Sequence, residues 1–153
     1  MNESAIGSTF EISLRILLML NELFPMKLDE QQIGAIDFIS VYAADFGLLD
    51  ENLHGYGSYR YSEFPARKQM VASALKNLIL DGYARLHPTS TGYRYSILET
   101  GKTVCDKLTS SYAKEYILAI QSVVSRFDKV NAASMLKEIN RLTIQSLQEV
   151  GHE

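Results

Sequence analysis

The chain has 153 residues, of which 46% are hydrophobic and 22% charged, and its formal net charge is −3. This composition is typical of one globular domain, with or without an appendage. The single cysteine, Cys105, excludes an internal disulfide, and no apolar run approaches the roughly 18 residues of a transmembrane helix. Residues 1–9 lack the basic start and apolar stretch of a signal peptide, so we expect a cytoplasmic protein that enters no membrane.

Two helices are expected in the first third of the chain. A capping box at residues 8–11 begins a helix that runs to about Phe24. Alternating apolar residues near its start also fit a strand, but the length and the cap favour a helix. It has so little polar surface that we expect it to be central and buried. A second capping box, Asp29 with Gln32, begins a helix that ends near Phe46.

A long connection follows the second expected helix. Residues 47–61 include three tyrosines, Tyr56, Tyr59 and Tyr61. A compact helix-turn-helix joins its two helices by about three to four residues. Longer loops are more often binding segments than spacers, so we interpret this segment as a candidate binding loop.

The stretch from Ser62 to Ile97 organises the rest of the chain. It is predicted to begin with a helix that has Ser62 as N-cap and Pro65 in its first turn. Gly82 ends this helix in the left-handed conformation. The apolar residues that repeat at helical spacing are Val71, Ala74, Leu75, Leu78 and Ile79.

Two short runs rich in β-formers come next. Tyr83–His87 and Tyr93–Ile97 flank a turn of Pro, Thr, Ser and Gly residues, which predicts a hairpin. A helix followed by such a hairpin is typical of the second half of a winged helix-turn-helix. We therefore expect a mainly α fold with a small β-hairpin, with residues 8–110 forming a winged-helix domain.

Residues 111–150 are interpreted as a C-terminal helical extension that supplies partner or dimer helices. A long helix is predicted to begin near Leu98, and beyond Tyr112 it carries apolar residues on two sides, so it needs two neighbours. Asn131 caps a last helix whose apolar face includes Met135 and Leu147. That helix can cover one side only, and another subunit is expected to cover the remainder.

Charge is distributed unevenly along the chain. Residues 1–57 sum to −7, residues 58–97 to +4 and residues 98–153 to zero. The basic middle makes DNA a candidate partner, because phosphate contacts supply most of the affinity for DNA. However, the outward face of the helix before the hairpin carries only one charge, Lys76, and also Leu80. The candidate DNA contacts are Arg67, Lys68, Lys76, Arg85 and Arg94.

Catalytic chemistry is not indicated by the sequence. Cys105 lies on an apolar helical stripe, where a small buried thiol is the common case. Three scattered histidines and one cysteine do not have the spacing of a metal site, and no glycine-rich loop has phosphate-binding spacing. We expect no catalytic residues, no metal and no cofactor.

Protein binding is the third interpretation. Tyrosine and arginine together are typical of interface hot spots, and several apolar residues have no evident partner within the chain. The alternative is that the tyrosines merely pack the loop against the following helix. The candidate partner-binding residues are Tyr56, Tyr59, Arg60, Tyr61, Phe64, Leu80, Tyr116 and Ile120.

A family resemblance is carried by strings spread over residues 8–118. These strings are Phe10–Leu17, Asp37–Tyr42, Asp45–Leu48, Glu51–Gly55, Tyr59–Phe64 and Tyr112–Tyr116. In them the chain resembles the middle component of bacterial ABC three-component defence systems, which are similar in layout to Lamassu systems. The last helix carries no motif of this family.

The resemblance implies a winged-helix accessory subunit without catalytic residues. Such a subunit bridges an SMC- or Rad50-like ATPase and an effector, often a nuclease, in anti-phage or anti-plasmid defence. Double-stranded DNA held by the ATPase is a further candidate partner. The residues leave one alternative open, a winged-helix DNA-binding transcriptional regulator that dimerises through its C-terminal helices.

Overall fold

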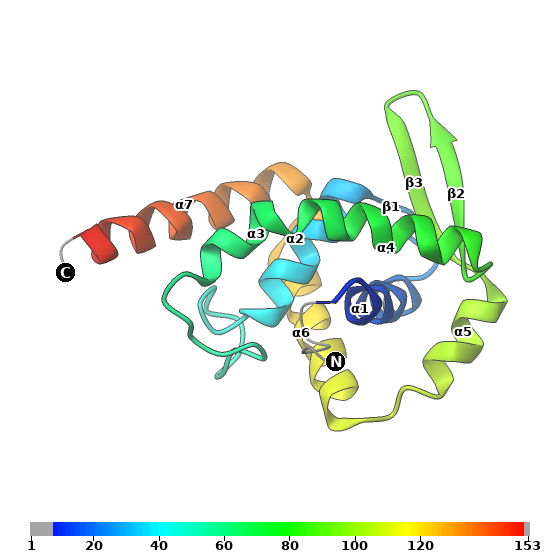
Figure 1. Ribbon diagram of the computed structural model, residues 1–153, viewed down its shortest axis with the longest axis horizontal. Helices are drawn as coiled ribbons and strands as arrows, with labels where there is room; N and C mark the ends of the chain where they lie inside the picture. The colour runs from blue at the N-terminus through cyan, green and yellow to red at the C-terminus, as the bar shows by residue number, and fades with distance from the viewer. Residues whose placement is uncertain (1–7, 152–153) are drawn as a thin grey trace.

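The computed structural model describes residues 8–151 and shows a mainly helical chain with a small three-stranded antiparallel sheet (Figure 1). Figure 1 places α1 in the middle of the fold, the β2–β3 hairpin projecting at one end and α7 extending at the other. The elements are α1 (Thr9–Glu22), β1 (Leu28–Asp29), α2 (Glu30–Val41), η2 (Arg60–Ser62), α3 (Glu63–Ala66), α4 (Lys68–Leu80), β2 (Ala84–Thr89), β3 (Gly92–Ile97), α5 (Glu99–Asp106), α6 (Ser111–Arg126), η3 (Asp128–Val130) and α7 (Ala132–Gly151).

Helix α1 is the buried central helix that the sequence predicts. Ser8 Oγ accepts a hydrogen bond from the backbone N–H of Glu11 at 3.0 Å and so caps the helix. The Glu11 carboxylate pairs with Arg15. The helix ends at Glu22, two residues before the expected end, because Pro25 disfavours helical backbone at Phe24.

Helix α2 begins with the predicted capping box. Asp29 accepts from the backbone N–H of Gln32 at 2.7 Å, and the Gln32 side chain accepts from that of Asp29 at 3.0 Å. The helix ends at Val41, earlier than expected, and residues 42–48 continue as turns. Strand β1 was not predicted, because a two-residue strand has no sequence period of its own; it pairs with β3.

The helix expected from Ser62 is divided into α3 and α4, and the short η2 precedes them. Ser62 does not cap it, since its hydroxyl donates to the carbonyl of Tyr59 at 2.7 Å. The backbone N–H of Arg67 donates to the carbonyl of Glu63 in α3, and that of Val71 in α4 donates to the carbonyl of Arg67. The backbone therefore passes from α3 into α4 with little interruption. The predicted stripe is buried at Val71, Ala74, Leu75 and Leu78, and half-buried at Ile79.

The predicted hairpin is present as β2 and β3, with Gly82 in the left-handed region before it (φ +80°). The sheet order is β1-β3-β2. Gly101 packs so closely under the sheet that a Cβ there would lie 2.4 Å from the carbonyl oxygen of Tyr83. Glycine is therefore required where α5 meets the base of the hairpin.

The long helix expected after the hairpin is two helices, α5 and α6. Ser110 separates the two helices, because its hydroxyl accepts from the backbone N–H of Ala113 at 3.1 Å and so caps the N-terminus of α6. The last helix, α7, is capped as predicted, with Asn131 Oδ1 accepting from the backbone N–H of Ser134 at 2.9 Å.

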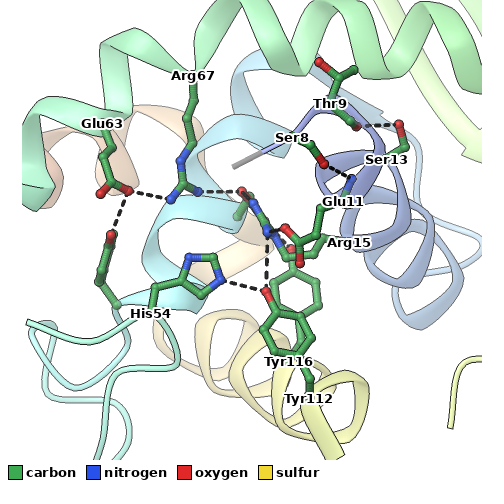
Figure 2. A network of polar contacts seen from close by, with 12 residues as sticks. Ser8, Thr9, Glu11, Ser13, Arg15, His54, Glu63, Arg67, Tyr112 and Tyr116 are labelled. Atoms are coloured by element: carbon green, nitrogen blue, oxygen red, sulfur yellow. Dashed lines mark hydrogen bonds and ion pairs between the residues drawn. The ribbon is translucent and has the colours of Figure 1, made fainter. Parts of the chain in front are cut away.

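A buried ion pair joins the helices at the centre of the fold. Arg15 on α1 donates two hydrogen bonds, at 2.7 and 3.0 Å, to the carboxylate of Asp37 on α2 (Figure 2). The hydroxyl of Tyr116 on α6 and the guanidinium of Arg67, which directly precedes α4, donate to the same carboxylate at 2.6 and 3.2 Å. Burial by itself raises the pKa of Asp37, but Arg15 and its other donors lower that pKa to about 2. Four segments thus converge on one charged group.

The same network holds the long loop between Ala43 and Tyr59. The His54 imidazole Nε2 lies 2.7 Å from the hydroxyl of Tyr112, which also accepts from Arg15 at 3.3 Å. The backbone N–H of His54 donates to the carbonyl of Val41 at 3.0 Å. Burial, together with the charge of Arg15, lowers the pKa of His54 to about 4. The imidazole of His54 is therefore neutral in the folded chain at neutral pH.

Replacing Asp37 with asparagine removes the carboxylate that the buried Arg15 and the half-buried Arg67 share. We expect Asp37→Asn to lower the free energy of unfolding by about 3–5 kcal/mol in urea denaturation, because removing one partner of a buried ion pair leaves the other poorly compensated. Glu138→Gln is the matched control, since it breaks the solvated Glu138–Arg141 pair. This control should lower the free energy of unfolding by at most about 1 kcal/mol. Equal losses for the two variants would contradict this role of Asp37.

His54 gives stability a defined pH dependence. Its pKa is about 4 in the folded chain, below the ordinary value of 6.5. The neutral imidazole of His54 therefore makes its full contribution to the free energy of unfolding above pH 6.5, and this contribution is lost as the pH falls to about 4. The loss amounts to about 3 kcal/mol by pH 4, at 1.36 kcal/mol per pKa unit.

The difference between the wild-type chain and His54→Gln, followed by urea denaturation from pH 7.5 to 4, isolates this effect. Glu11, with a raised pKa, and His87, with a lowered one, titrate in both proteins. We expect the stability of the variant to change less over this range. Parallel stability curves would show that His54 is not the responsible group.

Candidate interaction surface

The loop between α2 and η2 is internally hydrogen-bonded along residues 45–57. Asn52 is buried, accepts from the backbone N–H of Asp45 at 3.2 Å and donates to the carbonyl of Gly55 at 2.9 Å. The hydroxyl of Tyr56 accepts from the backbone N–H of Asn52 at 3.1 Å and donates to Glu51 at 2.8 Å. These bonds, and the anchor at His54, make the loop an ordered platform.

Arg60 fastens the end of this loop. Its guanidinium donates to the two carboxylate oxygens of Asp45 at 2.6 and 3.0 Å and to the carbonyl of Gly57 at 2.8 Å. It also lies 5.0 Å from the ring centre of Tyr61. The hydrogen bonds to Asp45 raise the pKa of Arg60. Arg60 therefore stabilises the loop itself, and Tyr61, which is buried, is part of that scaffold.

Tyr59 is the most exposed of the three loop tyrosines, with 70% of its surface accessible, and Tyr56 is 54% exposed. Tyr59 lies between two hollows where α7 passes η2 and α3. The larger, of about 460 Å³, is mostly apolar, and its lining includes Phe64, Leu136 and Leu147. The other, of about 430 Å³, is more polar, with Asp45 and Glu149 in its lining. Tyr59 and α7 thus form one continuous candidate surface, the Tyr59–α7 groove.

Helix α7 contributes more to this groove than the sequence indicates. Met135 and Ile139 are buried as expected, but Leu147, expected on the packed face, is 66% exposed. Ile144 is also exposed, but it lies outside the predicted stripe and lines neither hollow.

Three of the predicted partner-binding residues do not lie at the surface. Tyr61 is buried in the loop scaffold, and Tyr116 and Ile120 are fully buried because α6 packs against both α1 and α2. These two helices cover much of the second apolar side of α6, and Val124 stays exposed. Phe64 is half-buried, with its ring 5.3 Å from that of Phe38. Leu80 is 72% exposed, but it ends α4 beside the hairpin rather than at the groove.

The candidate DNA contacts differ in whether their charge is already paired within the chain. The predicted DNA contact Arg67 is not a free cation, because its guanidinium donates to Asp37 at 3.2 Å and to Glu63 at 2.6 Å. The exposed members of the set are Lys68, Lys76 and Arg85, and Arg94 is half-buried. Among residues 8–151 these four form no ion pair within 4 Å.

Cys105 has the surroundings of a structural thiol. It is buried, and its Sγ lies 3.5 Å from the carbonyl of Leu17 on α1. Burial raises the pKa of this thiol to about 11, whereas reactive thiols have lowered pKa values. Within the described residues, no three His, Cys, Asp or Glu side chains gather as metal ligands would, and no helix is long and apolar enough to span a bilayer.

Comparison with known proteins assigns the chain to a family. The family model for the ABC-three component (ABC-3C) system Middle Component 2 matches residues 5–149, nearly the whole chain. No curated protein and no solved structure gives a significant match. The chain belongs to the Middle Component 2 family of ABC three-component systems.

Proposed function

We propose that this chain is a non-catalytic winged-helix accessory subunit of a bacterial anti-phage or anti-plasmid complex similar to Lamassu. It bridges an SMC- or Rad50-like ATPase and an effector nuclease. Membership of the middle-component family supports partners within the same system. The single structural observation that carries the proposal is the Tyr59–α7 groove, an exposed aromatic and apolar surface on a hydrogen-bonded platform.

The order of elements supports the winged-helix part of the proposal. Helices α1, α2 and α4 are followed by the β2–β3 hairpin, and the short β1 completes a sheet of order β1-β3-β2. A winged helix has this arrangement, with the hairpin as its wing. The same fold serves many functions, so the functional part of the proposal depends on the surfaces.

Bridging requires two separate surfaces, and the chain offers two. Helix α7, which lines the Tyr59–α7 groove, extends at one end of the molecule, and the end of α4, which carries the exposed Leu80, lies at the other, beside the hairpin (Figure 1). A partner on the groove therefore leaves Leu80 free for a second contact.

The second candidate function is a DNA-binding transcriptional regulator. The observation that favours it is the exposed polar face of α4, which presents Gln69, Lys76 and Asn77. Such side chains can read base edges. The isolated chain would then bind one operator far more tightly than other DNA, with affinity that falls steeply as salt rises.

Tyr59→Ala combined with Leu147→Ala tests the groove. We expect this variant to fold normally and to bind the other components of its system at least about tenfold more weakly, because truncating an aromatic hot spot costs 2 kcal/mol or more. The measurement is co-purification and titration with the products of the neighbouring genes.

Tyr93→Ala is the matched control for this experiment. Tyr93 is 57% exposed, close to the value for Tyr59, but lies on the hairpin. Arg60 is unsuitable as a test residue because its loss would disturb the loop. Wild-type affinity in the Tyr59–Leu147 variant would overturn the assignment of the groove.

A further inference from the structure

The sheet has one apolar and one polar face, set by its register. Ala84, Leu86 and Pro88 on β2 lie opposite the apolar or aromatic residues Ile97, Tyr95 and Tyr93 on β3. The positions between them place Arg85 opposite Ser96, and His87 opposite Arg94. Because cross-strand partners share a face, Arg85, His87 and Arg94 lie on the polar side.

Strand β1 brings Lys27 to this polar face. The guanidinium of Arg94 donates to the carbonyl of Lys27 at 3.2 Å. The Nε2 atom of His87 lies 2.7 Å from the Oγ atom of Ser96. Burial lowers the pKa of His87, and the nearby charges of Lys27 and Arg85 lower it further. The register and these interactions gather Lys27, Arg85 and Arg94 around His87 on one side of the sheet.

In the described part of the chain, the positive charges of these three residues are not balanced by ion pairs with carboxylates. Within the described residues, Lys27, Arg85 and Arg94 form no ion pair within 4 Å. The register pairs Asp29 with Arg94, so one carboxylate lies beside the patch; it caps α2 by accepting from the backbone N–H of Gln32 at 2.7 Å and forms no ion pair with these cations. The cationic sheet face, defined as Lys27, Arg85 and Arg94, is thus a positive patch on a chain whose net charge is negative.

We propose that the cationic sheet face binds the phosphate backbone of double-stranded DNA. This inference rests on the proposed function, in which the complex handles DNA. Two arginines and a lysine suit phosphate oxygens, and a projecting hairpin can follow a duplex (Figure 1). The contact is independent of base sequence, since phosphate contacts position a protein without reading bases.

Helix α4 is a poorer phosphate-binding element than the sheet. Arg67, which precedes it, is held by Asp37 and Glu63. Lys68 lies beside Leu136 of α7 in the lining of a hollow of the fold. The outer face of α4 ends in the exposed side chain of Leu80. This leaves Lys76 as the one cation in the exposed middle of the helix.

The test replaces the three cations by glutamine, as Lys27→Gln, Arg85→Gln and Arg94→Gln in one full-length chain. Binding to a short labelled DNA duplex is followed by fluorescence anisotropy between about 50 and 200 mM salt. The wild-type chain should bind more tightly at low salt, with a slope of log K against log salt near −3. The triple variant should bind at least about tenfold more weakly, with a slope close to zero.

Two controls separate the sheet from other parts of the chain. Lys68→Gln with Lys76→Gln removes charge from α4, and Tyr93→Ala alters the opposite face of the same hairpin. Both should retain most of the wild-type affinity. A larger loss in the α4 variant, no binding by the wild-type chain, or tighter binding to duplex RNA of equal length would each overturn the proposal.

Co-purification with the neighbouring gene products distinguishes this inference from the proposed function. The triple variant should assemble like the wild-type chain, because its changes lie on the sheet and at the residue before β1, none of which lines the Tyr59–α7 groove. Loss of DNA binding with intact assembly supports the sheet contact. Intact assembly with unchanged DNA binding rejects the sheet contact and leaves the bridging role standing.

Discussion

The Arg15–Asp37 ion pair is the interaction on which the rest of the structure depends. It lies in the core, where an isolated charge is costly, so both groups need a full set of partners. Asp37 obtains its partners from α1, α6 and the segment before α4, through Arg15, Tyr116 and Arg67. Apolar contacts alone tolerate small shifts between helices, whereas these hydrogen bonds fix one arrangement.

The pair also determines how the binding loop is presented. On one side, Tyr112 links Arg15 to His54. On the other, Arg67 and the hydroxyl of Tyr42 reach Glu63 at the start of α3, at 2.6 and 2.7 Å. The loop is therefore held near both ends before any partner arrives. Pre-organisation of this kind lowers the entropic cost of association, which suits a small subunit that joins larger ones.

The sequence predicted well those features that depend on neighbouring residues. The capping box of α2, the apolar stripe of α4, the left-handed Gly82 and the hairpin all follow from short patterns. Features that depend on distant residues were missed. Nothing near Arg15 indicates that its partner is Asp37, and Arg67 was counted as a free cation because its charge cancels only in three dimensions. The two-sided helix α6 was assigned to a partner for the same reason, since the covering helices α1 and α2 are remote in sequence.

Hydrogen–deuterium exchange of the chain, alone and within its reconstituted complex, tests the central claim most directly. The claim is that a pre-formed loop and α7 make the groove that a partner covers. We predict that residues 57–66 and 132–147 gain protection on assembly, while α1 and α2, already protected in the free chain, change little. Protection confined to the hairpin, or a binding loop that exchanges fully in the free chain, would contradict the account.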